Sequence, residues 1–301
     1  MCYTKEKAQG AISMSVDILQ EKIRKSKNPS VLELAMPISD LPPRFDRNAA
    51  GYAGFCRELL EGLKGTVSAV RVSFSCFALL GAEGMSALTD TLKAAGELGY
   101  YVLMDAPEIL SPMMAKLVAE GIFGENSAFP CDGLVISGYL GSDIIKPFLP
   151  YCKEGKKDIF VTVRTANKSA SELQDMLSGS RVVHAAAADH VNRYGADAAG
   201  KFGYTRVGVM AAASAADSLR SLRMKYPRLF LLVDGYDYPN ANAKNCANAF
   251  DKFGHGAAVC GGTAITCAWV QAESDGADWL DHAKAAAERM KKNLTRYVTV
   301  L

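Results

Sequence analysis

Eight short apolar runs, alternating with stretches of helical periodicity, constrain the fold of this chain more than any other feature of its sequence. The runs are rich in β-branched and aliphatic residues and are bounded by turn signals. They span residues 31–36, 69–74, 100–106, 133–138, 158–165, 205–212, 229–235 and 257–262. Most of them are continuously apolar, which is typical of strands that are buried on both faces of a parallel sheet.

Strict alternation of strand and helix leaves two candidates, a doubly wound open sheet and a closed barrel. Eight repeats favour the barrel, and residues 36–39 lack the glycine fingerprint that a Rossmann fold carries after its first strand. Before the first run, Ile12, Val16, Leu19 and Ile23 form an amphipathic helical stripe that would pack on the barrel or close its bottom. We therefore predict an α/β chain with one domain over residues 1–301, a single (β/α)8 TIM barrel whose residues 1–28 form an extra N-terminal helix.

Charge and hydropathy limit the classes of partner that we expect for the chain. Its 34 basic and 32 acidic residues are scattered and give a formal charge of +2, so we expect no nucleic acid and no membrane as partners. The first ten residues are polar, and no later stretch holds about eighteen uninterrupted apolar residues. We expect a cytoplasmic protein.

Cysteine and histidine usage gives no sign of a metal or redox centre. The eight cysteines are widely spread without a CxxC pair, and the four histidines form no cluster. We therefore expect reduced thiols, no metal site and no cofactor. The histidines also lie away from the predicted strand ends, which indicates helix or loop residues rather than catalysts.

In a barrel of this kind, chemistry is carried by residues at the carboxyl ends of the strands. Asp105 and Asp234 end the third and seventh runs, where either could act as a base or position a substrate. Arg164 ends the fifth run and could pair with either aspartate or with an anionic ligand. An internal ion pair explains the same residues equally well.

The run Cys260-Gly261-Gly262-Thr263 leads from the last strand into a helix. Its backbone N–H groups could bind a phosphate, as loops after strands seven and eight of barrels often do. A tight turn that needs glycine explains Gly262 equally well. Tyr236 is a further polar side chain at the end of the seventh run, and we place it with Gly262 and Thr263 among the candidate ligand-binding residues.

The order of the segments resembles a known family. Residues 81–84, 98–106, 139–143 and 171–175 (Gly-Ala-Glu-Gly, Leu-Gly-Tyr-Tyr-Val-Leu-Met-Asp-Ala, Tyr-Leu-Gly-Ser-Asp and Ser-Glu-Leu-Gln-Asp) are similar to segments of the orotidine 5'-phosphate decarboxylases of the longer bacterial subfamily. The similarity runs in register from about residue 30 to about residue 298. It implies a lyase of pyrimidine biosynthesis that forms a homodimer across its barrel mouths.

The resemblance also implies an Asp-x-Lys-x-x-Asp motif after strand three, whose lysine protonates the carbon left by CO2. Here the first aspartate falls on Asp105, but Pro107 takes the lysine position and Leu110 the second aspartate, which in the family reaches the neighbouring subunit's site. Neither residue carries a titratable group. The family's strand-two lysine corresponds to Arg71, which keeps the charge but not the compact ammonium. We list Asp105 and Arg71 as residual catalytic candidates.

Other family positions differ as well. Apolar residues around Ala35 and Met36 stand where the family has an aspartate at the end of strand one. Thr263 takes the place of the phosphate-binding arginine. Thr165 and Asn167 resemble retained family residues and could touch a base or ribose, or they could serve loop geometry alone.

Three hypotheses follow. The first is a pseudoenzyme that has lost decarboxylation and acts as a binding or partner protein, as a homodimer or with an active paralogous subunit. The second is an enzyme of another class that uses Asp105, Arg164 and Asp234 on an unknown small molecule. The third is an active decarboxylase with a relocated lysine, such as Lys116 or Lys146.

Overall fold

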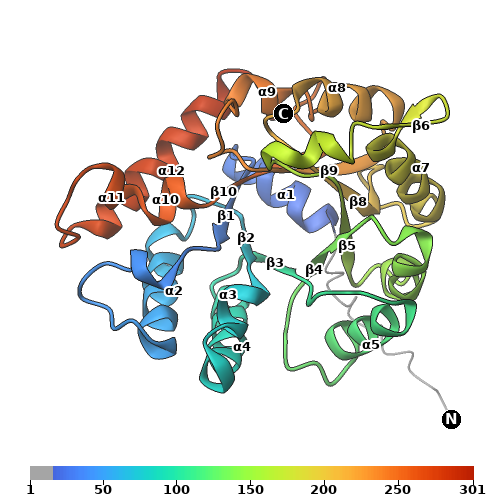
Figure 1. Ribbon diagram of the computed structural model, residues 1–301. Coiled ribbons are helices and arrows are strands. Elements are labelled where there is room, and N and C mark those ends of the chain that lie inside the picture. Colours follow the sequence, from blue (N-terminus) through green and yellow to red (C-terminus); the bar gives the residue numbers. More distant parts are fainter. Residues whose placement is uncertain (1–15) are drawn as a thin grey trace, which may run out of the picture.

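Eight parallel strands close into a barrel surrounded by helices in this computed structural model, which describes residues 16–301 (Figure 1). The strand order around the barrel is β1-β10-β9-β8-β5-β4-β3-β2. The strands are β1 Ser30–Leu34, β2 Ala69–Val72, β3 Tyr101–Asp105, β4 Gly133–Ser137, β5 Asp158–Arg164, β8 Thr205–Ala212, β9 Leu229–Asp234 and β10 Ala257–Gly261. The predicted fold class is confirmed. Seven of the eight barrel strands lie within their predicted runs, and β1 begins one residue before its run, at Ser30.

Helices and short turns fill the connections between the strands. The α-helices are α1 Val16–Ser26, α2 Ala49–Leu63, α3 Phe74–Ala78, α4 Gly81–Glu97, α5 Pro112–Phe123, α6 Leu149–Lys153, α7 Val183–Gly195, α8 Ala216–Lys225, α9 Ala243–Ala247, α10 Thr263–Thr266, α11 Ala268–Gln271 and α12 Trp279–Thr295. The 3-10 helices are η1 Ile38–Asp40, η2 Gly141–Ile144, η3 Lys146–Phe148 and η4 Lys168–Glu172. No helix in this part of the chain combines the length and apolar character needed to cross a bilayer.

Local sequence signals explain where several elements begin or end. Ser111 caps α5 by accepting a hydrogen bond from the Met114 backbone N–H at 3.2 Å, and Pro112 suits the first turn. Gly99 has φ +86° just after α4, which lets the chain turn into β3. A small antiparallel hairpin of β6 Leu177–Ser178 and β7 Arg181–Val182 was not predicted, because two-residue strands carry no periodicity.

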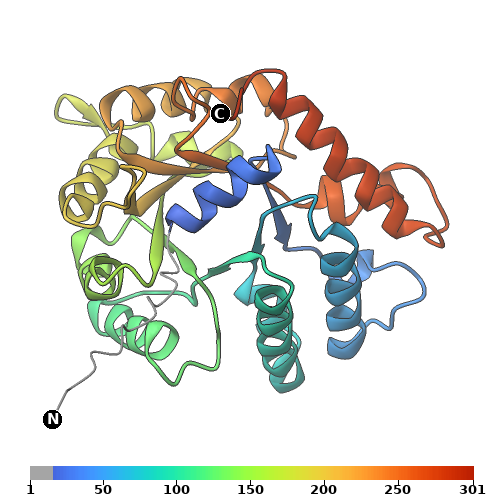
Figure 2. The ribbon, with the colours of Figure 1, turned by 180° about the vertical axis from the view of Figure 1, so that it is seen from behind.

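The helix α1, Val16–Ser26, lies across the amino-terminal end of the barrel (Figure 2). Lys22 Nζ donates to the Gly99 carbonyl before β3, and Gln20 Oε1 accepts from the Gly256 N–H before β10. Val16 and Leu19 of the predicted stripe are buried, whereas Ile12 lies outside the described residues. With this end covered, the carboxyl ends of the strands form the accessible mouth.

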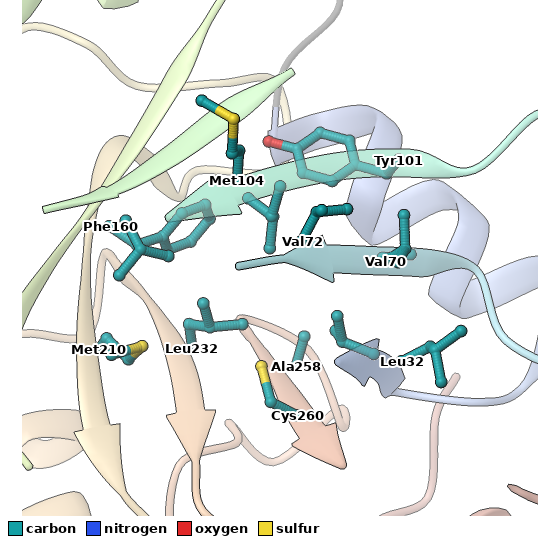
Figure 3. Close-up of a cluster of buried hydrophobic side chains, with 14 of the residues drawn as sticks. Leu32, Val70, Val72, Tyr101, Met104, Phe160, Met210, Leu232, Ala258 and Cys260 are labelled. Carbon is teal, nitrogen blue, oxygen red and sulfur yellow. The ribbon is translucent and has the colours of Figure 1, made fainter. Parts of the chain in front are cut away.

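Apolar side chains from neighbouring strands pack into one cluster inside this frame (Figure 3). Leu32, Phe160 and Leu232 are fully or almost fully buried. Burying a side chain of this size contributes about 1.5–3 kcal/mol relative to leaving it in water. The cluster therefore gives the polar residues at the strand ends a rigid support.

Candidate functional site

Arg71 on β2 is the centre of a charged cluster at the barrel mouth. Its Nε donates to Asp105 Oδ1 at 2.7 Å, and its Nη1 donates to Asp234 Oδ1 at 2.6 Å. Nη1 also lies 3.1 Å from Glu33 Oε1. Because Arg71 is only 7% exposed, one buried guanidinium joins carboxylates from β1, β3 and β9.

Strand register explains why these side chains meet. Glu33 of β1 is in register with Arg71 of β2, so the two side chains lie side by side at the same level of the barrel. Asp105 and Asp234 are the last residues of β3 and β9. The predicted candidates Arg71, Asp105 and Asp234 therefore come together, as a network of ion pairs.

Glu33 was not among the predicted site residues. The resemblance places the family's strand-one aspartate around Ala35 and Met36, where this chain is apolar, but β1 ends at Leu34 and its carboxyl group comes from within the strand. Glu33 is the only charged residue of the first apolar run, which is the signal that would have identified it. A charge at an otherwise buried strand position requires a partner, and Arg71 provides it.

The charges in the cluster shift one another's protonation. Burial raises the pKa of Glu33 to about 7, and Asp234, Asp105 and Asp237 add to the rise while Arg71 opposes it. Burial works against the charged form of Arg71, but Asp105, Glu33 and Asp234 outweigh it and hold the pKa of Arg71 above its ordinary value. Arg71 therefore stays cationic, and the cluster takes up or releases a proton near neutral pH.

A cavity of about 380 Å³ opens beside this cluster. Glu33, Arg71 and Asp234 line one part of it, and the predicted Gly262 and Thr263 line another. It is large enough for a small metabolite.

Tyr236, a predicted ligand-binding residue, does not line this cavity. Its hydroxyl accepts a hydrogen bond from Asn293 Nδ2 on α12 at 3.4 Å, and the side chain lies against a separate hollow. Tyr238 lines the mouth cavity instead. The strand ends at Asp234 and the chain turns at Gly235, with φ +70°, so alternation beyond the strand does not predict which tyrosine faces the mouth.

The turn after β10 holds a carboxylate of the chain itself. Asp237 Oδ2 accepts hydrogen bonds from the backbone N–H groups of Gly262 at 2.7 Å and Ala264 at 3.0 Å. A Cβ atom at Gly262 would lie 3.2 Å from Glu33 Oε2, a tight contact that glycine avoids, and 3.5 Å from Asp237 Oδ2, an ordinary van der Waals contact. Burial raises the pKa of Asp237, while its two backbone hydrogen bonds oppose the rise.

Arg164 has a different partner from those considered in the sequence. Its Nε and Nη2 donate to the two carboxylate oxygens of Asp175, at 3.0 and 2.9 Å, instead of pairing with Asp105 or Asp234. This is the two-pronged geometry that a guanidinium favours with a carboxylate. Arg164 thus fixes the loop after β5, and Arg71 takes the central place in the mouth.

Thr165 and Asn167 are held within the same loop. Gln174 Oε1 accepts from the Thr165 N–H at 2.8 Å, and Gln174 Nε2 donates to Thr165 Oγ1 at 2.7 Å. Thr165 Oγ1 in turn donates to Asn167 Oδ1 at 2.5 Å. These contacts support the interpretation that the two residues serve loop geometry.

Lysines lie away from the cluster. Lys116 and Lys146 pair with Glu120 and Asp143 on the outside of the barrel, and their side chains are largely exposed. Within residues 16–301, no lysine lines the mouth cavity. In the same range, no group of three or more histidine, cysteine or acidic side chains is arranged to hold a metal ion.

A closed parallel barrel with charged residues at its carboxyl-end mouth defines the class of (β/α)8-barrel proteins. No family model matches the chain. It is 29% identical over 277 residues to a protein of Rhodopirellula baltica named orotidine 5'-phosphate decarboxylase. The aligned region covers 89% of this chain and 92% of the relative. A Clostridium novyi protein of the same name is 25% identical over 286 residues and covers 93% of this chain. The resemblance inferred from the sequence is thereby confirmed: over most of its length the chain is similar to proteins named orotidine 5'-phosphate decarboxylase.

Solved structures show the same fold. A putative orotidine 5'-phosphate decarboxylase from Streptomyces avermitilis has a TM-score of 0.77 at 20% identity and covers 97% of this chain and 99% of that one. Leishmania donovani UMP synthase has a TM-score of 0.74 at 23% identity, with 94% of this chain covered. The chain spans 56% of that longer protein.

Proposed function

We propose that this homologue does not decarboxylate orotidine 5'-phosphate and acts as a binding or partner protein built on the decarboxylase barrel. The observation that carries the proposal is the environment of Asp105. Its carboxylate lies beside the guanidinium of Arg71, and the position where the family has its lysine is Pro107.

Proton delivery is the step that these residues do not support. The family's lysine protonates the carbon left by CO2, and proline has no proton to give. Arg71 is the nearest cation to Asp105, but the surrounding carboxyl groups hold its pKa above the ordinary value. A donor that releases its proton so reluctantly is a poor general acid, and the reaction has one of the largest barriers that enzymes lower.

A relocated lysine is the alternative that would restore activity. Lys116 and Lys146 lie on the outer surface with Glu120 and Asp143 as partners. Neither lysine lines the mouth cavity, and proton transfer needs a donor within hydrogen-bond distance of the accepting atom. The positions of Lys116 and Lys146 therefore do not support a relocated proton donor.

A second candidate function is catalysis of another class at the same mouth. It rests on Glu33, whose pKa of about 7 suits a group that accepts and returns protons at neutral pH. The residues of this candidate site are Glu33, Arg71, Asp105 and Asp234. Arg164, which the sequence suggested for it, pairs with Asp175 instead. Screening a metabolite library for ligands that raise the melting temperature tests it, because a ligand that binds only the folded state stabilises that state.

The partner role rests on exposed apolar side chains beside the mouth. Leu110 is 70% and Met113 is 73% exposed, and Leu117 and Leu140 are also exposed. Leu110 and Leu140 line a common hollow of about 260 Å³. Since Leu110 stands where the family's second aspartate reaches the neighbouring subunit, we propose that this surface joins a second copy of the chain or a paralogous subunit.

Cellular location is part of the same proposal. The seven cysteines in the described residues are all unpaired, and most are buried. Unpaired thiols suit a reducing compartment, so we propose that the protein works in the cytoplasm.

Direct assay tests the proposed function. Purified protein is incubated with orotidine 5'-phosphate and the ultraviolet absorbance is followed, with the Rhodopirellula baltica relative as positive control. We expect a rate equal to that of buffer alone. Turnover comparable to the positive control would end the proposal.

A further inference from the structure

Asp237 links the loops after β9 and β10 through a single carboxylate. It lies three residues beyond the end of β9, and its Oδ2 atom accepts the N–H hydrogens of Gly262 and Ala264, which flank Thr263 at the start of α10. Its other oxygen, Oδ1, is buried and has no hydrogen-bond partner. The carboxylate is thus inserted into the turn and does not extend into solvent.

The two N–H groups are of the kind that hold phosphate in barrels of this fold. Phosphate sites often form at the loops after the seventh and eighth strands, where backbone N–H groups at the start of a short helix point at the anion. In this barrel β9 and β10 are those strands. A phosphate oxygen would need the same two hydrogens that Asp237 Oδ2 already accepts.

The surroundings also disfavour a second anion. Glu33, Asp234 and Asp237 line the same cavity, with Arg71 as the cation among them. Arg71 is already engaged by the carboxylates of Glu33, Asp105 and Asp234. A phosphate group entering here would meet like charges at short range without a free guanidinium.

We propose that Asp237 is a specificity-determining residue, whose carboxylate occupies the backbone N–H groups of Gly262 and Ala264 and thereby excludes phosphorylated ligands from the mouth. The ligand class that remains is neutral or cationic small molecules without a phosphate group. This inference rests on the proposed function in that it names which ligands such a binding protein takes.

The test measures binding of inorganic phosphate to the full chain and to two variants. Asp237→Gly frees both N–H groups, whereas Asp237→Asn removes the charge and keeps an oxygen that can accept them. Asp217→Asn, at an exposed aspartate in the first turn of α8, is the control for loss of one negative charge. Affinities come from calorimetric titration, and the backbone amide signals of Gly262 and Ala264 report the place of binding by NMR.

We expect phosphate to bind Asp237→Gly at least about tenfold more tightly than the wild type, a difference of about 1.4 kcal/mol, with shifts of the Gly262 and Ala264 amide signals. Asp237→Asn should lie between them, and Asp217→Asn should match the wild type. The proposal is wrong if the wild type binds phosphate at these amides as tightly as Asp237→Gly, or if folded Asp237→Gly gains nothing. Should Asp237→Gly fail to fold, absence of any gain in Asp237→Asn overturns the proposal.

These outcomes are separate from those of the decarboxylase assay. Turnover of orotidine 5'-phosphate by the wild type contradicts the proposed function, whereas the phosphate titration reports on the two amides alone. If Asp237→Gly gains no phosphate affinity, the argument from Pro107 and Arg71 against decarboxylation is unaffected.

Discussion

The Nε atom of Arg71 donates to Oδ1 of Asp105 at 2.7 Å, so the carboxylate that ends β3 is bound to a guanidinium. The same guanidinium also holds Asp234 of β9. Arg71 therefore links strands on either side of the mouth and neutralises part of the charge gathered there.

Replacing Arg71 with methionine should destabilise the fold. The change leaves Glu33, Asp105 and Asp234 close together without a cation, and removing one partner of a buried ion pair costs about 3–5 kcal/mol. Urea unfolding at pH 7 measures the loss. The loss should shrink at pH 5, because Glu33, whose pKa is about 7, is then protonated and no longer adds to the repulsion. A loss that is equal at both pH values would contradict this account.

Glu33 should make stability depend on pH. Its pKa rises from an ordinary value of 4.5 to about 7 in the folded protein, so the folded state binds this proton more tightly than the unfolded state. The resulting contribution is fully present below about pH 4.5 and is lost as pH rises through about 7, with an upper bound of about 3 kcal/mol. The reason is that ionisation of Glu33 costs free energy in the folded state, where the residue is buried, and not in the unfolded state.

The variant Glu33→Gln isolates this contribution. Glutamine keeps the size of the side chain and does not titrate, so its stability relative to the wild type should increase between pH 5 and pH 8. Urea unfolding of both proteins across this range gives the comparison. If the difference in unfolding free energy between the wild type and the variant is the same at every pH, Glu33 does not titrate as described.

The eight strands were predictable because burial on both faces leaves continuous apolar runs. The site was predictable only in part, because its contacts depend on register and loop conformation. Arg71 lies next to the end of β2 and Arg164 ends β5, but only Arg71 reaches Asp234. Arg164 pairs with Asp175, eleven residues further along the chain, and no periodicity predicts the conformation of the loop that brings the two together.

The partner of Glu33 could not be predicted from the sequence either. One charged residue in an apolar run gives no indication of which neighbour pairs with it, and the parallel register of β1 with β2 decides that it meets Arg71. Similarly, φ +70° at Gly235 turns the chain after β9, so that Tyr238 and not Tyr236 faces the cavity. Local sequence patterns do not predict strand register or the direction of a loop, and these two decide which side chains meet.

Leu110→Asp should weaken the proposed contact between subunits. Leu110 is 70% exposed beside the mouth, and a carboxylate placed in an apolar interface must lose its hydration without gaining a partner. Sedimentation velocity should show a dimer for the wild type and a larger monomer fraction for the variant. Met224→Asp is the matched control, because Met224 is an exposed apolar residue on α8 and should leave the dimer intact. A monomeric wild type would remove this surface as a homodimer contact and leave the paralogous subunit as its partner.

Restoring the family's lysine alone should not restore decarboxylation. In Pro107→Lys the new ammonium would have to compete with Arg71 for Asp105, and the N–H groups of Gly262 and Ala264 would still be occupied by Asp237. We expect no turnover of orotidine 5'-phosphate by Pro107→Lys in the absorbance assay. The combination of Pro107→Lys, Arg71→Lys and Asp237→Gly removes both obstacles and should exceed the single variant. If Pro107→Lys alone decarboxylates at the rate of the triple variant, neither Arg71 nor Asp237 limits the site in the way their contacts indicate.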